Sequence, residues 1–134
     1  MPARFLGDFR NQPHCELPQE YFEQRDCWVD CRENDTLWIS KEANIGYDNK
    51  FIVQSHDVRP GQFGTLVGRK IIIERHAFVT SHCILYNCRI GEGAIVAVGS
   101  VVRSQQIPAW TMVAGNPAKV IKIFNPLTNQ WEKI

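Results

Sequence analysis

The sequence of 134 residues holds 15 lysine and arginine residues against 14 aspartate and glutamate residues, and 44% of it is apolar. This balance is typical of one globular domain, and it excludes intrinsic disorder and an electrostatically driven nucleic-acid binder, because no basic excess exists to neutralise phosphates. No apolar run is long enough to span a membrane, no signal peptide is recognisable and five cysteines fit no disulfide framework, so we expect a cytoplasmic protein with reduced thiols.

Residues 1–25 are predicted to form an irregular arm, because Pro2, Pro13 and Pro18 interrupt regular structure, with a short helical stretch around residues 18–25. The segments that follow, CWVDCR and ENDTLW, could form two degenerate copies of a six-residue unit that recurs later in the chain. They would add most of one coil to the structure that this unit builds.

Apolar residues recur every six positions in two stretches of the chain. They are Ile39, Ile45 and Phe51 in the first stretch and Ile84, Ile90, Val96 and Val102 in the second. Small residues follow four positions later at Ala43, Ser55, Cys88, Ala94 and Ser100. A period of six fits neither an amphipathic helix nor simple strand alternation. It predicts an all-β fold, a short parallel β-helix of about three to four coils at roughly 18 residues per coil, with large residues inside a three-sided prism and small ones at its corners.

The repeat breaks between residues 57 and 71, where Pro60, Gly61, Gly64 and Gly68 are turn residues that do not suit stacked strands. We therefore predict a loop that leaves the prism in this region.

The segment IIIERHAFVTSHC restarts the repeat in one of two registers. Counting back in sixes from the second stretch puts His76 and His82 at the small positions. Counting forward from Ile73 puts Ala77 and Cys83 there instead, and requires a one-residue deletion near residue 84. The second register fits the size rule better and is the one we predict.

After Ile107 the repeat stops, and Pro108, Pro117 and Pro126 punctuate a stretch that we expect to hold a crossing segment, a strand or turn of helix, and a tail. The chain is thus predicted to be a single domain, with an arm over 1–25, a β-helix over 26–107 and a C-terminal segment over 108–134. So short a prism leaves its faces and ends uncovered, and three prisms side by side would be the natural closed assembly.

Two segments resemble a known family. VAVGSVVRSQQIPAWTMVAGNPAKVIK closely resembles the closing segment of the hexapeptide-repeat acyltransferases, among them galactoside, maltose and serine acetyltransferases and the sugar O-acetyltransferases of capsule and exopolysaccharide synthesis. ISKEANIGYDNKFIVQSHD looks like the coil that carries the catalytic histidine in this family. The resemblance covers about residues 36–123. It implies a left-handed parallel β-helix, a homotrimer with active sites between neighbouring prisms, acetyl-CoA as acyl donor, and no metal.

By this resemblance, His56 is the expected general base, and an imidazole suits that role because it exchanges protons near neutral pH. Asp57 follows directly and could orient the ring or contact the acceptor, although a backbone carbonyl is an equally good partner for the ring. Sugar acetyltransferases of the family often place an asparagine before the histidine, but a count without gaps reaches Asp26 and Trp28 here. These two residues are the candidates for binding the acceptor, which the resemblance implies is a saccharide.

The resemblance also implies that the pantetheine arm of the donor binds main-chain groups along the C-terminal coils. The implicated residues are Ala97, Val98, Gly99 and Ser100, with Phe78 and Ser81 on the coil beneath. Gly99 and Ser100 could equally serve only to turn the corner. The candidate cations for the phosphates, each of which could also be a plain surface charge, are Lys119, Lys122 and Arg103.

Other chemistries fit less well. The apolar neighbours of Cys83 and Cys88 are typical of buried thiols rather than nucleophiles. Cys27 and Cys31 lack the two further ligands that a zinc site needs. The spacing of the γ-class carbonic anhydrases is not matched by the three histidines of the prism, His56, His76 and His82.

The sequence therefore predicts a CoA-dependent O-acetyltransferase that acts on a sugar hydroxyl. Two alternatives stay open, namely an N-acetyltransferase of an amino sugar or an antibiotic acetyltransferase, and a non-catalytic β-helix that serves as a scaffold subunit.

Overall fold

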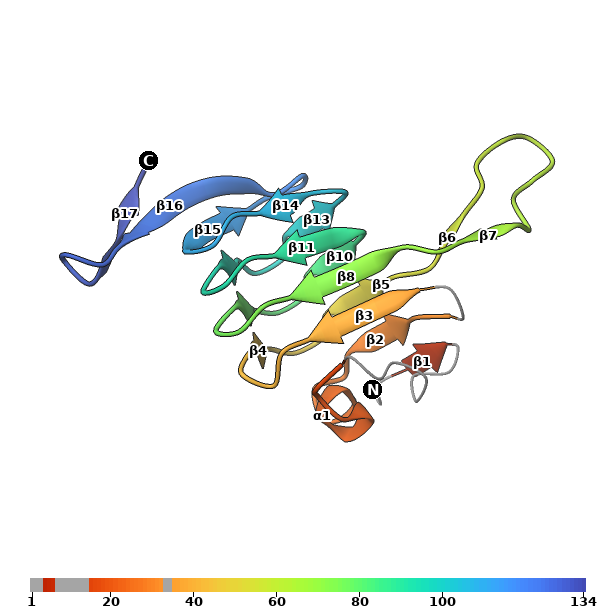
Figure 1. Ribbon diagram of the computed structural model, residues 1–134, viewed down its shortest axis with the longest axis horizontal. Coiled ribbons are helices and arrows are strands. Elements are labelled where there is room, and N and C mark those ends of the chain that lie inside the picture. Colours follow the sequence, from red (N-terminus) through yellow and green to blue (C-terminus); the bar gives the residue numbers. More distant parts are fainter. Residues whose placement is uncertain (1–3, 7–14, 33–34) are drawn as a thin grey trace.

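Three parallel sheets form the sides of a prism in the computed structural model, which describes residues 4–6, 15–32 and 35–134 (Figure 1). The first face holds β1 (Arg4–Leu6), β2 (Trp28–Asp30), β5 (Lys50–Ile52), β10 (Ile84–Tyr86) and β13 (Val101–Arg103). The second face holds β3 (Thr36–Ile39), β8 (Lys70–Ile73), β11 (Cys88–Ile90) and β14 (Gln106–Ile107). The third face holds β4 (Asn44–Ile45), β9 (Phe78–Val79), β12 (Ile95–Val96) and β15 (Thr111–Ala114). The chain visits the three faces in turn from β2 to β15, which confirms the predicted short β-helix.

Each face points a column of large apolar side chains into the prism, and successive members of a column are register partners in neighbouring strands. The first column is Val29, Phe51, Leu85 and Val102. The second is Ile39, Ile73, Ile90 and Ile107, and the third is Ile45, Val79, Val96 and Val113. Every member is at most 5% exposed. Since burying one such side chain contributes about 1.5–3 kcal/mol, these columns hold the coils in register.

The register after the loop is the one that counts forward from Ile73. Ala77 and Cys83 are fully buried at the corners of the prism. His76 and His82 lie beside them and are exposed, with φ of 62° and 56°. The alternative register, which places the two histidines at the small positions, is wrong.

The predicted one-residue deletion lies just after β10. Ile84, predicted to point inward, is half-buried on the outer side of β10, and Leu85 takes the inward place. The step from Leu85 to Ile90 is short because Asn87 alone, at φ 45°, turns the corner between β10 and β11.

The chain leaves the prism between β5 and β8, as predicted, but the excursion covers residues 54–69 rather than 57–71 and forms a hairpin (Figure 1). Ser55, predicted to turn a corner of the prism, lies in this hairpin, and Lys70 already begins β8. The hairpin strands β6 (Ser55–His56) and β7 (Leu66–Val67) pair antiparallel, and the N–H of Asp57 donates to the carbonyl of Thr65 at 2.9 Å. This pairing gives residues 54–69, called the loop hairpin below, a fixed base.

A short helix closes the N-terminal end of the prism. Helix α1 (Gln19–Glu23) lies within the stretch where a helix was predicted, and its Phe22 is fully buried. The Phe22 ring packs edge-on against Phe51 with 5.6 Å between ring centroids, which covers the lowest coil. No helix among the described residues is long and apolar enough to cross a bilayer.

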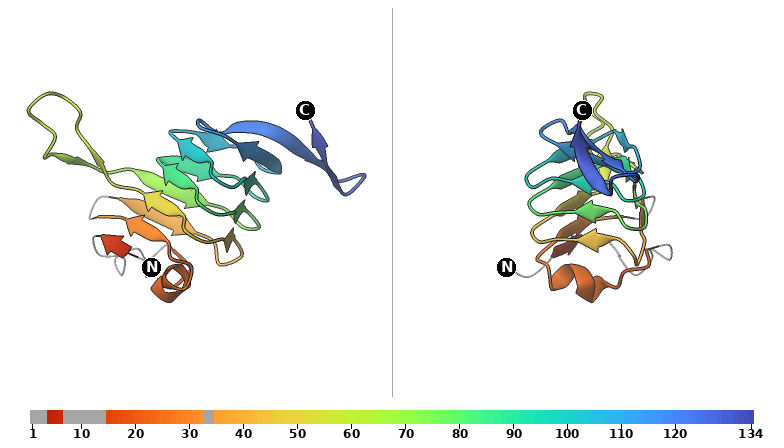
Figure 2. Two further views of the ribbon diagram at one scale, coloured as in Figure 1. Left: turned by 180° about the vertical axis from the view of Figure 1, so that it is seen from behind. Right: turned by 90° about the vertical axis from the view of Figure 1, so that its left-hand side faces the viewer.

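At the other end, the stacked strands continue beyond residue 107, because Val113 on β15 completes the third column. The β-helix predicted to end at residue 107 therefore ends at Ala114. Strands β16 (Lys119–Asn125) and β17 (Gln130–Lys133) then extend the third face antiparallel. Their hairpin projects on the side of the prism opposite the loop hairpin (Figure 2).

Candidate active site

The prism has three corners, and the candidate residues are placed relative to them. The first corner joins the first and second faces and includes the loop hairpin. The second corner joins the second and third faces, and the third corner joins the third and first faces. These corners decide which side chains can meet within one chain.

His56 lies on β6, at the base of the loop hairpin, and its side chain is exposed. Its neighbour Ser55 turns toward the prism, where its Oγ is 2.7 Å from Oη of Tyr86 on β10. Successive side chains of a strand point to opposite sides. The imidazole of His56 is therefore directed away from the Tyr86 side of the strand.

A backbone carbonyl orients the His56 ring. Nδ1 lies 2.7 Å from the carbonyl oxygen of Phe63, which crosses over from the tip of the same hairpin. Because a carbonyl oxygen only accepts hydrogen bonds, Nδ1 carries the proton, and Nε2 keeps its lone pair. This is the tautomer that a neutral general base needs.

The carboxylate of Asp57 binds Arg59 rather than the His56 ring. Its carboxylate accepts from the backbone N–H of Arg59 at 2.9 Å and from Nη2 of Arg59 at 2.6 Å. The hydrogen bonds from Arg59 hold the pKa of Asp57 below its usual value. Of the two ring partners that the sequence left open, the structure shows the backbone carbonyl.

The residues expected to bind pantetheine lie at the third corner. Residues 97–100 form the turn between β12 and β13, and the N–H of Gly99 donates to the carbonyl of Ser81 one coil below at 3.0 Å. Val98 is 68% exposed and Gly99, at φ +76°, faces open space, so a ligand could approach this main chain closely. Ser100 is fully buried and its hydroxyl donates to the carbonyl of Ala97 at 2.6 Å, which makes its side chain a corner-turning group.

The other predicted donor-binding residues are spread more widely. Phe78 lies on the outer side of β9 and is 40% exposed. Lys119 and Lys122 lie on β16, which extends the third face. Arg103 ends β13 at the first corner, so it shares a corner with His56 and not with residues 97–100.

The predicted acceptor residues Asp26 and Trp28 lie at the start of the first face in the lowest coil. Asp26 belongs to a column of third-corner residues with positive φ, which continues upward through Asp48, His82 and Gly99. Trp28 is 38% exposed on the outer side of β2. Both residues therefore lie near the third corner, at the edge where the strands of the first face begin. His56 lies at the first corner, beyond the edge where these strands end.

Within one chain, then, His56 lies at one edge of the first face, and residues 97–100, Asp26 and Trp28 lie at the opposite edge, whereas Asp57 and Arg103 share the corner of His56. The structure does not bring His56 and residues 97–100 together in a single copy. A site that contains both needs the first corner of one copy beside the third corner of another.

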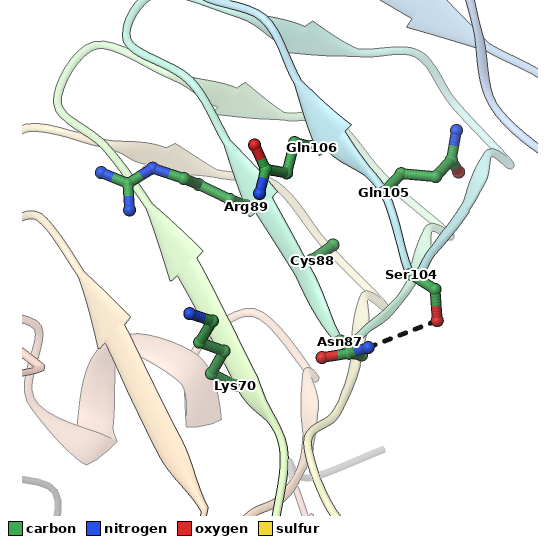
Figure 3. Close-up of a pocket in the computed structure, with 7 residues that line it drawn as sticks. All are labelled: Lys70, Asn87, Cys88, Arg89, Ser104, Gln105 and Gln106. Carbon is green, nitrogen blue, oxygen red and sulfur yellow. Dashed lines mark hydrogen bonds between the residues drawn. The ribbon is translucent and has the colours of Figure 1, made fainter.

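A hollow of about 200 Å³ runs along the first corner, on the coils above the loop hairpin (Figure 3). Asn87 and Ser104 meet at its edge, with Asn87 Nδ2 donating to Ser104 Oγ at 3.3 Å. Its lining is polar apart from one thiol and consists of Lys70, Asn87, Cys88, Arg89, Ser104, Gln105 and Gln106. No pattern in the sequence singled out these residues, although the one-residue deletion predicted near residue 84 falls here, at Asn87.

The three histidines of the prism cannot share a metal ion within one chain, because each lies at a different corner. His76, at the second corner, has Nε2 3.7 Å from a carboxylate oxygen of Glu42. His82, at the third corner, has Nε2 3.7 Å from a carboxylate oxygen of Asp48. Among residues 4–6, 15–32 and 35–134, no three His, Cys, Asp or Glu side chains gather in a way that could hold a metal.

Cys83 and Cys88 are buried, as their apolar neighbours in the sequence suggested, and Cys27 and Cys31 are buried as well. Burial raises the pKa of Cys27 to about 11 and the pKa values of Cys31 and Cys88 to about 12. Burial also raises the pKa of Cys83, whose side chain lies 3.2 Å from the carbonyl oxygen of Ala97. A nucleophilic cysteine needs a thiolate, so none of these groups is suited to that role.

These pKa shifts predict slow alkylation of the folded protein. At about pH 8, iodoacetamide should modify Cys15, which is only partly buried, before the four buried cysteines, and all five should react once urea unfolds the chain. Peptide mass spectrometry after timed quenching measures each site. Fast native alkylation of Cys83 or Cys88 would contradict the prediction.

Comparison with known proteins gives relatives of one kind. No protein-family profile matches the chain. Over 104 residues it is 37% identical to the putative lipopolysaccharide biosynthesis O-acetyl transferase of Escherichia coli, covering 74% of this chain and 53% of that protein. Over 53 residues it is 51% identical to the 2,3,4,5-tetrahydropyridine-2,6-dicarboxylate N-acetyltransferase of Staphylococcus aureus, covering 39% of this chain and 22% of that protein. The chain thus spans about half of the first relative and about a fifth of the second.

Solved structures share the fold at low identity. A hexapeptide-repeat acetyltransferase from Vibrio cholerae matches with a TM-score of 0.63 and 21% identity, covering 93% of this chain and 73% of that one. AntD, an N-acyltransferase from Bacillus cereus in complex with dTDP and 3-hydroxybutyryl-CoA, matches with a TM-score of 0.62 and 22% identity, covering 77% and 59%. A maltose O-acetyltransferase from Clostridium difficile matches with a TM-score of 0.58 and 18% identity, covering 92% and 58%. The chain is thus similar in sequence to acetyltransferases, and it shares its parallel β-helix fold with hexapeptide-repeat acetyltransferases.

Proposed function

We propose that the protein transfers an acetyl group from acetyl-CoA to a hydroxyl of a saccharide, and that it acts as a homotrimer in the cytoplasm. The observation that carries this proposal is the His56 imidazole, which the Phe63 carbonyl holds in the tautomer with an unprotonated Nε2. The ring stands exposed on a hairpin that leaves the prism. It is therefore available to a substrate bound outside its own chain.

A closed ring of three copies supplies the missing half of the site. Each interface of such a ring is heterologous, so the first corner of one copy can face the third corner of the next. The donor would then lie between His56 of one copy and residues 97–100 of its neighbour. Lys119, Lys122 and Arg103 are the cations proposed for its phosphates, and Asp26 and Trp28 of the neighbour, with Asp57, are proposed to contact the acceptor.

The reaction needs no covalent enzyme intermediate. His56 Nε2 accepts the proton of the acceptor hydroxyl as its oxygen attacks the thioester carbonyl carbon. Main-chain N–H groups stabilise the oxyanion that forms. The carbon–sulfur bond then breaks, the thiolate of CoA leaves, and the proton held by His56 neutralises it, so the products are an acetyl ester and free CoA.

A hydroxyl acceptor is favoured over an amine by the match to the E. coli O-acetyl transferase, which runs over 104 residues, against 53 for the S. aureus N-acetyltransferase. AntD has also been solved with dTDP-4-amino-4,6-dideoxyglucose, which supports a saccharide or sugar nucleotide as the acceptor class. An amino-sugar acceptor is the second candidate, because the S. aureus relative is an N-acetyltransferase and AntD, an N-acyltransferase, binds dTDP-4-amino-4,6-dideoxyglucose.

The test compares paired acceptors that differ in one group. Acetyl-CoA is incubated with the protein and a panel of hexoses and sugar nucleotides, each beside its amino-sugar counterpart, and released CoA thiol is followed with a chromogenic disulfide. We expect thiol release that depends on the hydroxyl acceptor, and an acetylated product that mild alkali cleaves as an ester.

The other outcomes are decisive as well. An alkali-resistant product formed only from the amino sugars would replace O-transfer by N-transfer. A protein that shows no heat of binding with CoA by calorimetry and no thiol release would be a scaffold subunit, and the proposed function would be wrong.

A further inference from the structure

The strand that carries His56 is tied to the coil above it by a side-chain hydrogen bond. Ser55 Oγ lies 2.7 Å from Tyr86 Oη, and both residues are half-buried. Tyr86 is the last residue of β10 and the register partner of Ile52, the last residue of β5. The bond therefore joins the loop hairpin to the prism at the place where the chain leaves it.

The bond between Ser55 and Tyr86 fixes the position of β6 and also the direction in which the His56 side chain points. Ser55 and His56 are the two residues of β6, so their side chains point to opposite sides of the strand. Holding the Ser55 hydroxyl against Tyr86 turns the imidazole of His56 outward. Pairing with β7 holds β6 within the hairpin, and the bond to Tyr86 ties a side chain of β6 to the prism.

The same strand is anchored on its lower side by the backbone. The N–H of Gln54 donates to the carbonyl of Asp30 at 3.1 Å, in the coil beneath. The start of the hairpin is therefore bonded to the coil below through Gln54 and to the coil above through Ser55. These two contacts are called the clamp. The Phe63 carbonyl fixes the ring within the hairpin, and the clamp fixes the hairpin relative to the prism.

We propose that Tyr86 is a positioning residue for the acyl transfer, acting through Ser55 to hold the imidazole of His56 at the productive angle. The hydroxyl of Tyr86 bonds to Ser55, so Tyr86 acts on the ring through the strand that carries it. This inference rests on the proposed function of His56 as general base.

Tyr86→Phe removes the hydroxyl and keeps the ring. We expect kcat to fall about tenfold, because the catalytic ring samples unproductive directions, while KM for acetyl-CoA stays within about twofold. Ser55→Ala should have the same effect, and the double variant should be no slower than either single variant, since all three break the same bond. Ser55→Thr keeps a hydroxyl and should retain most of the wild-type kcat.

A second readout does not depend on turnover. In protein labelled with ¹⁵N-histidine, the His56 signals, assigned by their absence in His56→Gln, should report an Nδ1–H tautomer. In Tyr86→Phe the tautomer should stay, because the Phe63 carbonyl moves with the hairpin, but the His56 signals should shift and broaden as the hairpin moves relative to the prism. Should the wild type show no acetyl transfer while this shift is seen, the positioning stands and the proposed function is wrong.

Tyr21→Phe is the matched control. Its hydroxyl accepts a hydrogen bond from the N–H of Ile45 at 3.1 Å, so the variant also loses one tyrosine hydrogen bond, at the helix that closes the prism. We expect a lower melting temperature with unchanged kcat and unchanged His56 signals. If Tyr86→Phe behaves like Tyr21→Phe in both readouts, Tyr86 is only a structural residue and the proposal is overturned.

Discussion

Replacing His56 by alanine is expected to lower kcat/KM for acetyl transfer about a thousandfold, within the range that a single general base supplies. The variant loses the group that accepts the acceptor proton, so the hydroxyl must attack in its protonated form. The side chain is exposed, and its truncation opens no cavity in the core. Melting temperature and assembly size should therefore stay at their wild-type values.

The measurement separates chemistry from binding. Acceptor-dependent release of CoA thiol gives kcat/KM, and calorimetry gives the dissociation constant for CoA, which we expect to change less than about threefold because the base does not hold the donor. His76→Ala is the control, since His76 is also exposed but lies at the second corner. Its turnover should match that of the wild type. Full turnover of His56→Ala would remove this residue from the mechanism.

The β-helix could be predicted because each face of every coil needs an inward-pointing apolar side chain, and this need recurs at a fixed spacing in the sequence. A narrow prism accepts one large apolar side chain per face, so residues such as Ile45 and Val96 recur at a period that no helix shares. The prediction was wrong at Ile84, where two adjacent apolar residues are equally good candidates for the inward place. The choice between Ile84 and Leu85 depends on the corner at Asn87, which consists of a single residue. The number of residues in a corner cannot be read from the sequence.

The candidate site was less predictable than the fold. His56 was found through the family resemblance, and neither the Phe63 carbonyl nor Tyr86 could be selected from the sequence. Phe63 contributes a backbone oxygen, which any residue type provides, and its place follows from the fold of the hairpin tip. Tyr86 meets Ser55 because the loop hairpin starts beneath β10, a juxtaposition that sequence distance hides.

Because His56 and Val98 lie at different corners of the prism, two inactive variants are expected to restore activity when they assemble together. Mixing two inactive variants, His56→Ala and Val98→Trp, is expected to restore about a quarter of the wild-type activity. Val98 is 68% exposed at the third corner, so a tryptophan there fits the fold and fills the space proposed for the donor. Displacing the donor by even about an ångström can cost about a hundredfold, so each variant alone should be nearly inactive.

The quarter follows from how each site is assembled. If a site takes His56 from one copy and the third corner from the next, a random equal mixture supplies an intact His56 half the time and an intact third corner half the time. The two variants are unfolded together, refolded at equal concentration and examined by native mass spectrometry, which must show mixed assemblies before activity is measured. Mixing His56→Ala with the double variant His56→Ala/Val98→Trp is the control, and it should stay inactive because no copy then carries the base. Mixed assemblies of the two single variants that remain inactive would show that each site lies within one copy, and the proposed cleft between copies would be wrong.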